Sequence, residues 1–165
     1  MKPLLQTESS ECGLACLAMI TSHYGHHLDL ADLSRQFAIS LKGATLAQLM
    51  RHASALQLST RPLGLELDEL SELQLQCILH WNLNHFVVLK KVAKNWQGKV
   101  TLTLLDPAVG ERQVSLAEAS THFTGVALEL LVDLPLSDLH FASPSFSYAE
   151  SIHRAYQAFR SSFDA

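Results

Sequence analysis

The chain has 165 residues, a length that usually corresponds to a single domain. Hydrophobic residues make up 48% of it and charged residues 17%, with 7 Gly and 5 Pro, which excludes disordered, collagen-like and low-complexity proteins. The net charge of −4 gives no basic surface for nucleic acid, so we expect no nucleic-acid partner. Three cysteines are too few for a disulfide framework and fit a reducing compartment.

The longest apolar run near the N-terminus, residues 12–20, is too short to cross a bilayer. Glu8 and Glu11 precede this run, whereas a secretory signal peptide carries basic residues there. We therefore expect a cytoplasmic domain, with no membrane span in this chain.

The N-terminal part of the chain is predicted to be helical. Hydrophobic spacing predicts helices at 12–24, at 30–38 and over 43–56. Ser10 or Glu11 is expected to cap the first helix and Asp29 the second, and Gly25 is expected to end the first.

After Pro62 the pattern changes to strands, which are predicted at 77–81, 85–92, 99–105 and 126–132, with a short helix at 116–122. The segment Asn95-Trp96-Gln97-Gly98 is a turn signal, so the strands on either side of it are expected to form a hairpin. Helices followed by antiparallel strands indicate an α+β fold in which N-terminal helices pack on an antiparallel sheet.

The composition changes again after Pro135, and we divide the chain into a domain at 1–135 and a tail at 136–165. Residues 136–147 resemble a linker, and aromatic residues then recur at helical spacing from Tyr148 to Phe163. This pattern fits equally well a helix docked on its own domain and a helix that lies on a membrane or on a neighbouring domain.

Cys12 is a candidate nucleophile because it lies at the N-terminus of the first predicted helix. Unpaired backbone N–H groups and the positive end of the helix dipole favour a thiolate there. Cys16, one turn further on, and Cys77, in a predicted strand, lie among apolar residues and are interpreted as core. Taken alone, a cysteine in the position of Cys12 is more often structural than nucleophilic.

A nucleophilic cysteine needs a base, and His85 is the best placed of the nine histidines. It opens a strong predicted strand, and Asp106 ends the next one. If the two strands form the predicted hairpin, its open end brings His85 and Asp106 together, so that Asp106 can orient the imidazole and stabilise the imidazolium.

Gln6, six residues before Cys12, is a candidate for the remaining part of such a site. Its side-chain amide can join the Cys12 backbone N–H in an oxyanion hole, where one donor contributes about 3 kcal/mol at the transition state. By itself, this position is better explained as a solvated N-terminal residue.

Together these residues resemble the C39 peptidases. The cysteine motif runs from Gln6 to Ile20 and contains Glu11-Cys12-Gly13-Leu14-Ala15-Cys16, a specific signal. The histidine motif is His85-Phe86-Val87-Val88-Leu89, and the aspartate motif is Asp106-Pro107-Ala108. The resemblance covers residues 1 to about 132 in the order and spacing of the family.

The resemblance implies a papain-like fold and cysteine endopeptidase activity that removes double-glycine leader peptides from bacteriocin or similar precursors, coupled to ABC export. It implies Cys12 as nucleophile, His85 as general base and acid, Asp106 as its orienting partner and Gln6 as oxyanion donor. No cofactor is implied. The partners would be the leader peptide, bound as an amphipathic helix in an apolar groove, and the transmembrane and nucleotide-binding domains of the same exporter, at the cytoplasmic face of the bacterial inner membrane. The tail would lead toward the membrane domain.

Two other functions are compatible with these residues. The first is a substrate-docking domain of an exporter that binds the leader without cutting it. The second is a metalloprotein, because Cys12 and Cys16 share a helix face and His23, His26 and His27 follow. Cys16 lies in the most apolar stretch and the histidines surround a helix end, so we interpret the histidines as solvated. We predict no metal site.

Overall fold

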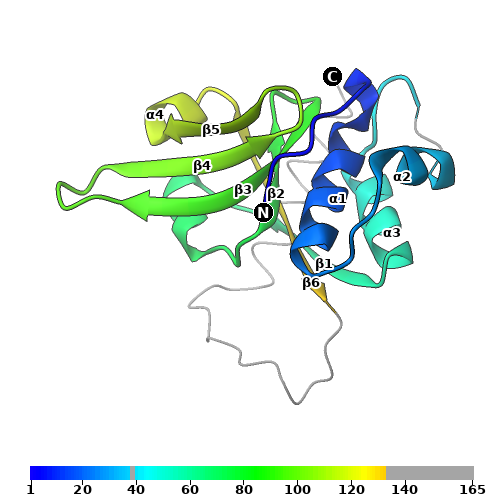
Figure 1. The fold of residues 1–165 in the computed structure, drawn as a ribbon. Helices are drawn as coiled ribbons and strands as arrows, with labels where there is room; N and C mark the ends of the chain where they lie inside the picture. The colour runs from blue at the N-terminus through cyan, green and yellow to red at the C-terminus, as the bar shows by residue number, and fades with distance from the viewer. Residues whose placement is uncertain (38–39, 133–165) are drawn as a thin grey trace, which may run out of the picture.

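The computed structural model describes residues 1–37 and 40–132, so the predicted linker and helix at 136–165 lie outside the described residues. Three helices gather on one side of the molecule, beside a six-stranded antiparallel sheet with the strand order β1-β6-β2-β3-β4-β5 (Figure 1). The predicted α+β architecture is confirmed. The elements are η1 (Ser9–Glu11), α1 (Cys12–His23), α2 (Leu30–Gln36), α3 (Leu46–Ala55), β1 (Leu58–Gly64), η2 (Leu67–Glu72), β2 (Cys77–Trp81), β3 (His85–Lys94), β4 (Val100–Asp106), β5 (Gly110–Ser115), α4 (Leu116–Ala119) and β6 (Phe123–Val132).

Helix α1 is the central helix, and every residue from its start at Cys12 to Thr21 is buried. Gly13 allows this close packing, because a Cβ atom there would lie 3.1 Å from Leu49 Cδ1 and 3.6 Å from Phe86 Cδ2. The helix ends where Gly25 adopts a φ of +91°, the left-handed conformation that glycine tolerates best. The first residues of α1 are therefore held between α3 and β3.

The predicted side-chain cap of α1 is wrong. Neither Ser10 nor Glu11 supplies a cap hydrogen bond to this helix from within the described part of the chain. Glu11 instead accepts from the backbone N–H groups of Thr7 and Glu8 and from the Ser34 hydroxyl. These bonds fix the turn that precedes Cys12. By contrast, Asp29 caps α2 as predicted, by accepting from the N–H of Ala31 at 2.8 Å.

Two strands were not predicted, and both lie at an edge of the sheet. Strand β1 contains Pro62, which an edge strand accommodates because one side of it makes no ladder hydrogen bonds. Strand β5 reads Gly-Glu-Arg-Gln-Val-Ser and buries only Gly110 and Val114, so its hydrophobic alternation is too weak to predict a strand. Because β5 was not predicted, the position of Arg112 on this strand was not predicted either.

The sheet separates two hydrophobic cores, as the period-two alternation of strand side chains requires. One face packs against α1, α2 and α3 and includes Ile78 and Val88. The other face includes Cys77 and Val87 and is covered in part by η2 and α4. Cys16 is buried in the first core and Cys77 in the second, as predicted for structural cysteines.

Candidate active site

Cys12 is the first residue of α1 and is 2% exposed. The preceding turn η1 changes the direction of the chain there, so the thiol sits at the positive end of a 12-residue helix. No side chain within the described residues caps this end, so the position matches the predicted environment of a nucleophilic thiol.

His85 and Asp106 lie together, as the hairpin argument predicted. His85 Nε2 and Asp106 Oδ1 are 2.8 Å apart, and the two side chains are 17% and 7% exposed. Strands β3 and β4 pair in antiparallel register from Lys94 and Val100 back to Val88 and Leu105, which brings the start of β3 next to the end of β4. Two rigid strands therefore hold the imidazole and the carboxylate.

The pKa of His85 depends on both Asp106 and Cys12. Burial lowers the pKa of His85, but the hydrogen bond that Asp106 accepts and the interaction with Cys12 outweigh burial and raise the pKa to about 9. Asp106 shows the opposite balance: burial raises its pKa, but the hydrogen bonds from His85 and Ala108 and the charges of His85 and Arg112 lower it overall. At neutral pH this arrangement favours an imidazolium paired with a carboxylate, within hydrogen-bonding reach of the thiol.

Asp106 has two further partners, neither of which was predicted from the sequence. The backbone N–H of Ala108 donates to Oδ1 at 2.9 Å. Arg112, on β5, places its Nε 3.7 Å from Oδ2 and its guanidinium 5.7 Å from the centre of the Trp81 ring. The Nε is buried without a hydrogen-bond partner among the described residues, so its charge acts on Asp106 mainly through space. Arg112 therefore helps to keep Asp106 ionised.

Gln6 reaches the same region from the N-terminal segment. Its backbone N–H donates to the carbonyl of Pro107 at 2.9 Å, which anchors Gln6 beside the loop that follows Asp106. Its side-chain oxygen is buried and has no hydrogen-bond partner among the described residues. Buried polar atoms without a partner are uncommon and often belong to functional sites. The interpretation of Gln6 as a freely solvated residue is therefore wrong.

The other sequence candidates fall outside this centre. Burial raises the pKa of both Cys16 and Cys77, so both remain thiols in the core. His23, His26 and His27 are exposed, away from the buried Cys12 and Cys16. Within residues 1–37 and 40–132, no three His, Cys, Asp or Glu side chains are arranged to hold a metal ion.

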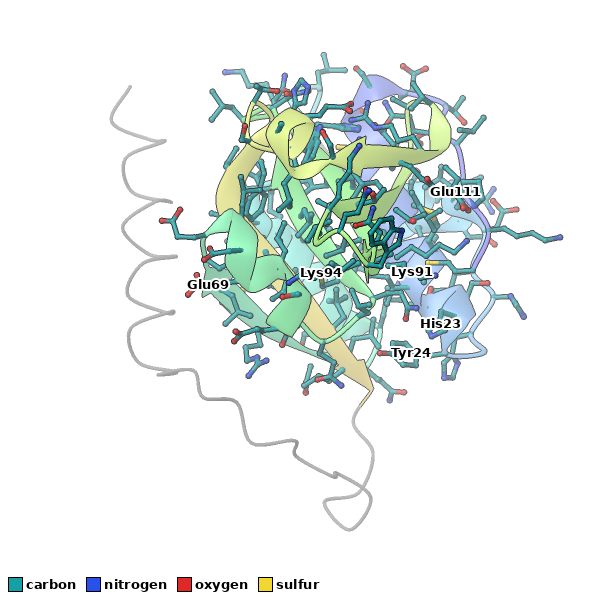
Figure 2. The ribbon with its side chains drawn as sticks, turned by 90° about the vertical axis from the view of Figure 1, so that its left-hand side faces the viewer. His23, Tyr24, Glu69, Lys91, Lys94 and Glu111 are labelled. Carbon is teal, nitrogen blue, oxygen red and sulfur yellow. The ribbon has the colours of Figure 1, made fainter. Side chains whose placement is uncertain are left out.

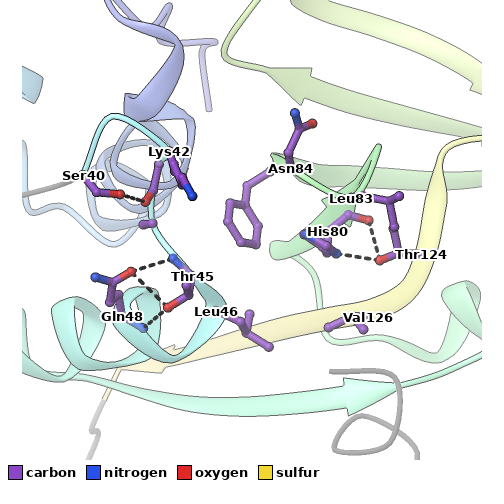
Figure 3. Close-up of a pocket in the computed structure, with 13 residues that line it drawn as sticks. Ser40, Lys42, Thr45, Leu46, Gln48, His80, Leu83, Asn84, Thr124 and Val126 are labelled. Carbon is purple, nitrogen blue, oxygen red and sulfur yellow. Dashed lines mark hydrogen bonds between the residues drawn. The ribbon is translucent and has the colours of Figure 1, made fainter. Parts of the chain in front are cut away.

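A pocket of about 440 Å³ opens beside the His85 end of β3 (Figure 3). Ala44 and Phe86 line it, and each would lie 3.6 Å from a Cβ atom at Gly13, the residue after Cys12, so the pocket wall is close to the start of α1. Within the wall, His80 Nδ1 lies 2.8 Å from Thr124 Oγ1, and burial lowers the pKa of His80, which keeps this ring neutral. The lining residues are Ser40, Lys42, Gly43, Ala44, Thr45, Leu46, Gln48, His80, Leu83, Asn84, Phe86, Thr124 and Val126.

The rim of this pocket contains a strained turn. Asn82 and Leu83, between β2 and β3, have φ values of 51° and 64°, in the left-handed region that disfavours side chains such as leucine. Two bonds to His122 hold the turn: the Asn82 N–H donates to its carbonyl at 2.8 Å, and the Asn82 side-chain oxygen lies 2.7 Å from its Nδ1. As a result Leu83 stands 74% exposed at the pocket.

The family model of Peptidase C39 matches residues 1–132. The chain belongs to the peptidase C39 family. It is 53% identical over 125 residues to the colicin V secretion/processing ATP-binding protein CvaB of Escherichia coli and 50% identical over 125 residues to the probable microcin-H47 secretion/processing ATP-binding protein MchF of the same species. Each match covers 76% of this chain and 17% of the relative, so the chain corresponds to less than a fifth of those C39 proteins.

Solved C39 structures share the fold. One is the crystal structure of a double glycine motif protease from an AMS/PCAT transporter in complex with the leader peptide, with a TM-score of 0.70, 30% identity and coverage of 79% of this chain and 91% of that one. Another is the peptidase domain of Streptococcus ComA, with a TM-score of 0.70, 25% identity and coverage of 79% and 97%. The predicted papain-like fold is confirmed. No helix in the described part of the chain is long and apolar enough to cross a membrane.

Proposed function

We propose that this C39 domain is a cysteine endopeptidase that removes double-glycine leader peptides from bacteriocin or similar secreted precursors. The observation that carries the proposal is the 2.8 Å contact between His85 and Asp106, with Cys12 beside them at the start of α1. The C39 membership and the likeness to a double glycine motif protease support the choice of substrate.

The bond-forming and bond-breaking steps use the side chains of Cys12, His85 and Asp106 and a water molecule. The Cys12 thiolate attacks the carbonyl carbon of the second leader glycine, and His85 protonates the leaving amine as the C–N bond breaks. The resulting thioester is hydrolysed by water, whose proton passes to His85, and the leader is released with a free carboxyl terminus. Asp106 holds Nε2 of the ring, so that Nδ1 is the nitrogen left for Cys12 and the substrate.

Two groups are proposed to stabilise the oxyanion that forms in this reaction. The side-chain amide of Gln6 is the first, because the backbone bond to Pro107 anchors this residue beside Asp106 and its NH₂ group can donate to the oxyanion. The backbone N–H of Cys12 is the second, because it belongs to an α1 terminus that lacks a side-chain cap among the described residues. Hydrogen-bond donors act most strongly on an oxyanion where water is excluded, and Cys12 is only 2% exposed.

The pocket beside His85 is proposed to bind leader residues that precede the glycine pair. Phe86, Leu46 and Val126 give it apolar walls, and Leu83 adds an exposed apolar rim. A Cβ atom at Gly13, the residue after Cys12, would lie only 3.1 Å from Leu49 Cδ1, so space beside the nucleophile is limited, which favours substrate residues without side chains. We therefore expect glycine at the two positions before the cut.

The exporter context is also a proposal. The curated relatives are named as secretion/processing ATP-binding proteins, and the chain covers 17% of their length. We infer that residues 1–135 form the peptidase domain of such an exporter, at the cytoplasmic face of the bacterial inner membrane. Residues 136–165 would then connect it to transmembrane and nucleotide-binding domains.

The deciding experiment combines a cleavage assay with thiol labelling. Purified protein is incubated with a synthetic leader peptide that contains Gly-Gly, and with the same peptide carrying Ala-Ala. We expect two fragments from the first peptide and none from the second. Brief treatment with iodoacetamide should label Cys12 in preference to Cys16 and Cys77 and abolish cleavage.

Two results would contradict the proposal. Leader binding without cleavage by the intact protein would identify a substrate-docking domain instead. Cleavage that survives complete labelling of Cys12 would exclude this thiol as the nucleophile. Cys77→Ala provides the matched control, because it removes a buried thiol that lies in the other core.

A further inference from the structure

The tip of the β3–β4 hairpin, residues 91–99, carries a charge opposite to that of the rest of the chain. From His85 to Leu105 the sequence contains four lysines and no aspartate or glutamate. Since the whole chain carries −4, the remainder carries −8. Lys90 pairs with Glu111 at 2.7 Å. Lys91, Lys94 and Lys99 are exposed, and none of them forms an ion pair with another described residue.

Trp96 stands at the end of this hairpin and is 91% exposed. The other tryptophan of the chain, Trp81, is fully buried. Exposure of a whole indole to water is unfavourable, because burial of a large apolar side chain stabilises a protein. The tip therefore combines an uncovered aromatic group with unpaired cations.

The turn that presents Trp96 is ordered. The Asn95 side-chain oxygen accepts from the N–H groups of Gln97 and Lys99 at 3.0 and 2.8 Å. The Asn95 backbone donates to the Lys99 carbonyl at 2.9 Å, and Gly98 supplies the φ of +81° that closes the turn. Trp96 is thus held in position by its neighbours and is not part of a loose loop.

The tip also points away from the rest of the molecule. In Figure 1 the β3–β4 hairpin extends on the side opposite to α1, α2 and α3, and His85 lies at the other end of β3. Figure 2 views the molecule from the hairpin side and shows Lys91 and Lys94 on that face. A flat surface can therefore approach the tip without covering Cys12 or the pocket.

We propose that this tip docks on an anionic lipid bilayer, with the Trp96 indole at the level of the headgroups and the three lysines facing lipid phosphates. Tryptophan concentrates at membrane interfaces, and lysines near an anionic leaflet are attracted to it. A protein partner fits less well, because lysine is depleted in protein interfaces and a convex tip of nine residues is small beside the ~800 Å² that each partner buries in a stable complex. The proposal is independent of the peptidase activity.

Trp96 itself reports on this docking. Vesicles of phosphatidylcholine alone are compared with vesicles that also contain phosphatidylglycerol, and the tryptophan emission of the full 165-residue chain is recorded. We expect a blue shift with the anionic vesicles only, because Trp81 is already buried and contributes a constant background. The shift should decrease as salt is added, since salt screens exposed charges.

Two variants test the assignment. Lys91→Gln/Lys94→Gln/Lys99→Gln keeps Trp96 and is expected to weaken the vesicle-induced shift, with a partition coefficient roughly 100-fold lower. Trp96→Ala should lose the vesicle-dependent change in emission. Lys2→Gln/Arg51→Gln, which removes two exposed charges outside the hairpin, is the control and should behave as the parent chain.

The outcomes separate this proposal from the previous one. Both hairpin variants should cleave a leader peptide in solution at the parent rate, because the tip lies away from Cys12. Absence of a blue shift with anionic vesicles, an equal shift with neutral vesicles or an unchanged shift in the triple lysine variant would overturn bilayer docking. None of these results bears on peptide cleavage.

Discussion

Within residues 1–37 and 40–132 the fold buries two acidic side chains in similar settings, and only one belongs to the candidate site. Asp106 is 5% exposed and Glu129 is fully buried. Asp106 pairs with His85 and accepts from the Ala108 backbone, whereas Glu129 pairs with Arg61 and accepts from the Gln74 backbone at 2.7 Å. Each pair also has a cysteine nearby, since Cys12 helps to raise the pKa of His85 and Cys77 is aligned with Glu129 in the β2–β6 register.

The difference lies in what the cation can do. An arginine guanidinium does not exchange protons in catalysis, so the pair of Arg61 with Glu129 only neutralises a buried charge. Burial and the charge of Glu129 raise the pKa of Cys77, so this thiol is inert. His85 can accept and donate a proton, and it stands between a carboxylate and a thiol. Reactivity therefore depends on a titratable partner, and burial by itself does not create it.

The largest effect on the cleavage rate is expected when Cys12 is replaced by alanine, with Cys77→Ala as the comparison. Cys12→Ala should lower the rate of leader cleavage by roughly 10⁶-fold, as loss of a catalytic nucleophile does. Leader binding should survive. Cys77→Ala should retain cleavage, with a small loss of stability from the cavity it leaves. Fragment yield by mass spectrometry and peptide binding by calorimetry measure both effects, and turnover by Cys12→Ala would contradict the comparison.

Removal of the charge on Asp106 should have the next largest effect. In Asp106→Asn the amide no longer stabilises the imidazolium, so cleavage should slow by up to about 10⁴-fold, less than in Cys12→Ala. The matched substitution Glu129→Gln should leave the cleavage rate of the folded enzyme unchanged. Equal losses of rate in the two variants would show that Asp106 acts only through stability.

Stability should show the opposite order. Glu129→Ala leaves the Arg61 guanidinium partly buried without its partner, and breaking such a pair typically lowers the free energy of unfolding by about 3–5 kcal/mol. It also removes the acceptor of the Gln74 N–H. Urea denaturation measures the loss, with Glu111→Ala, at an exposed ion pair, as the control that should lose about 1 kcal/mol or less.

Several parts of the site could be predicted from sequence because they depend on local rules. The start of a buried helix placed Cys12, and the turn signal at 95–98 fixed the hairpin that brings His85 to Asp106. Each of these two inferences needed only one element or two elements adjacent in the chain. Gln6 was assigned only through the resemblance to C39 peptidases, because its position alone favoured a solvated residue.

The remaining parts depend on contacts between distant segments. Arg112 lies on β5, an edge strand without clear alternation, so neither its strand nor its contact with Asp106 was visible in the sequence. The pocket combines residues from the start of α3, the β2–β3 turn and β6, which lie far apart in the chain. The left-handed Leu83 has no sequence signal either, because glycine or asparagine is the usual residue in that conformation.

The smallest expected effect is a difference in pH dependence between the two pairs. The pKa of His85 is raised from 6.5 to about 9, so its contribution to stability is complete below pH 6.5 and is lost as the pH rises through about 9. The lowered pKa of Asp106 acts at the other end: its contribution is present above its ordinary value of 3.8 and is lost as the pH falls below it. Between these limits both groups are charged.

Urea denaturation from pH 6 to pH 10 should therefore show a decrease in stability that His85→Gln reduces. Ionisation of the buried thiols in the unfolded state also lowers stability above pH 8, but it is common to both proteins and cancels in their difference. The Arg61–Glu129 pair contains no imidazole, so it supplies no counterpart to the decrease that His85 causes. A slope unaltered by His85→Gln would mean that the imidazole is not held as a cation, and the contrast between the two pairs would then have to rest on the position of Cys12 alone.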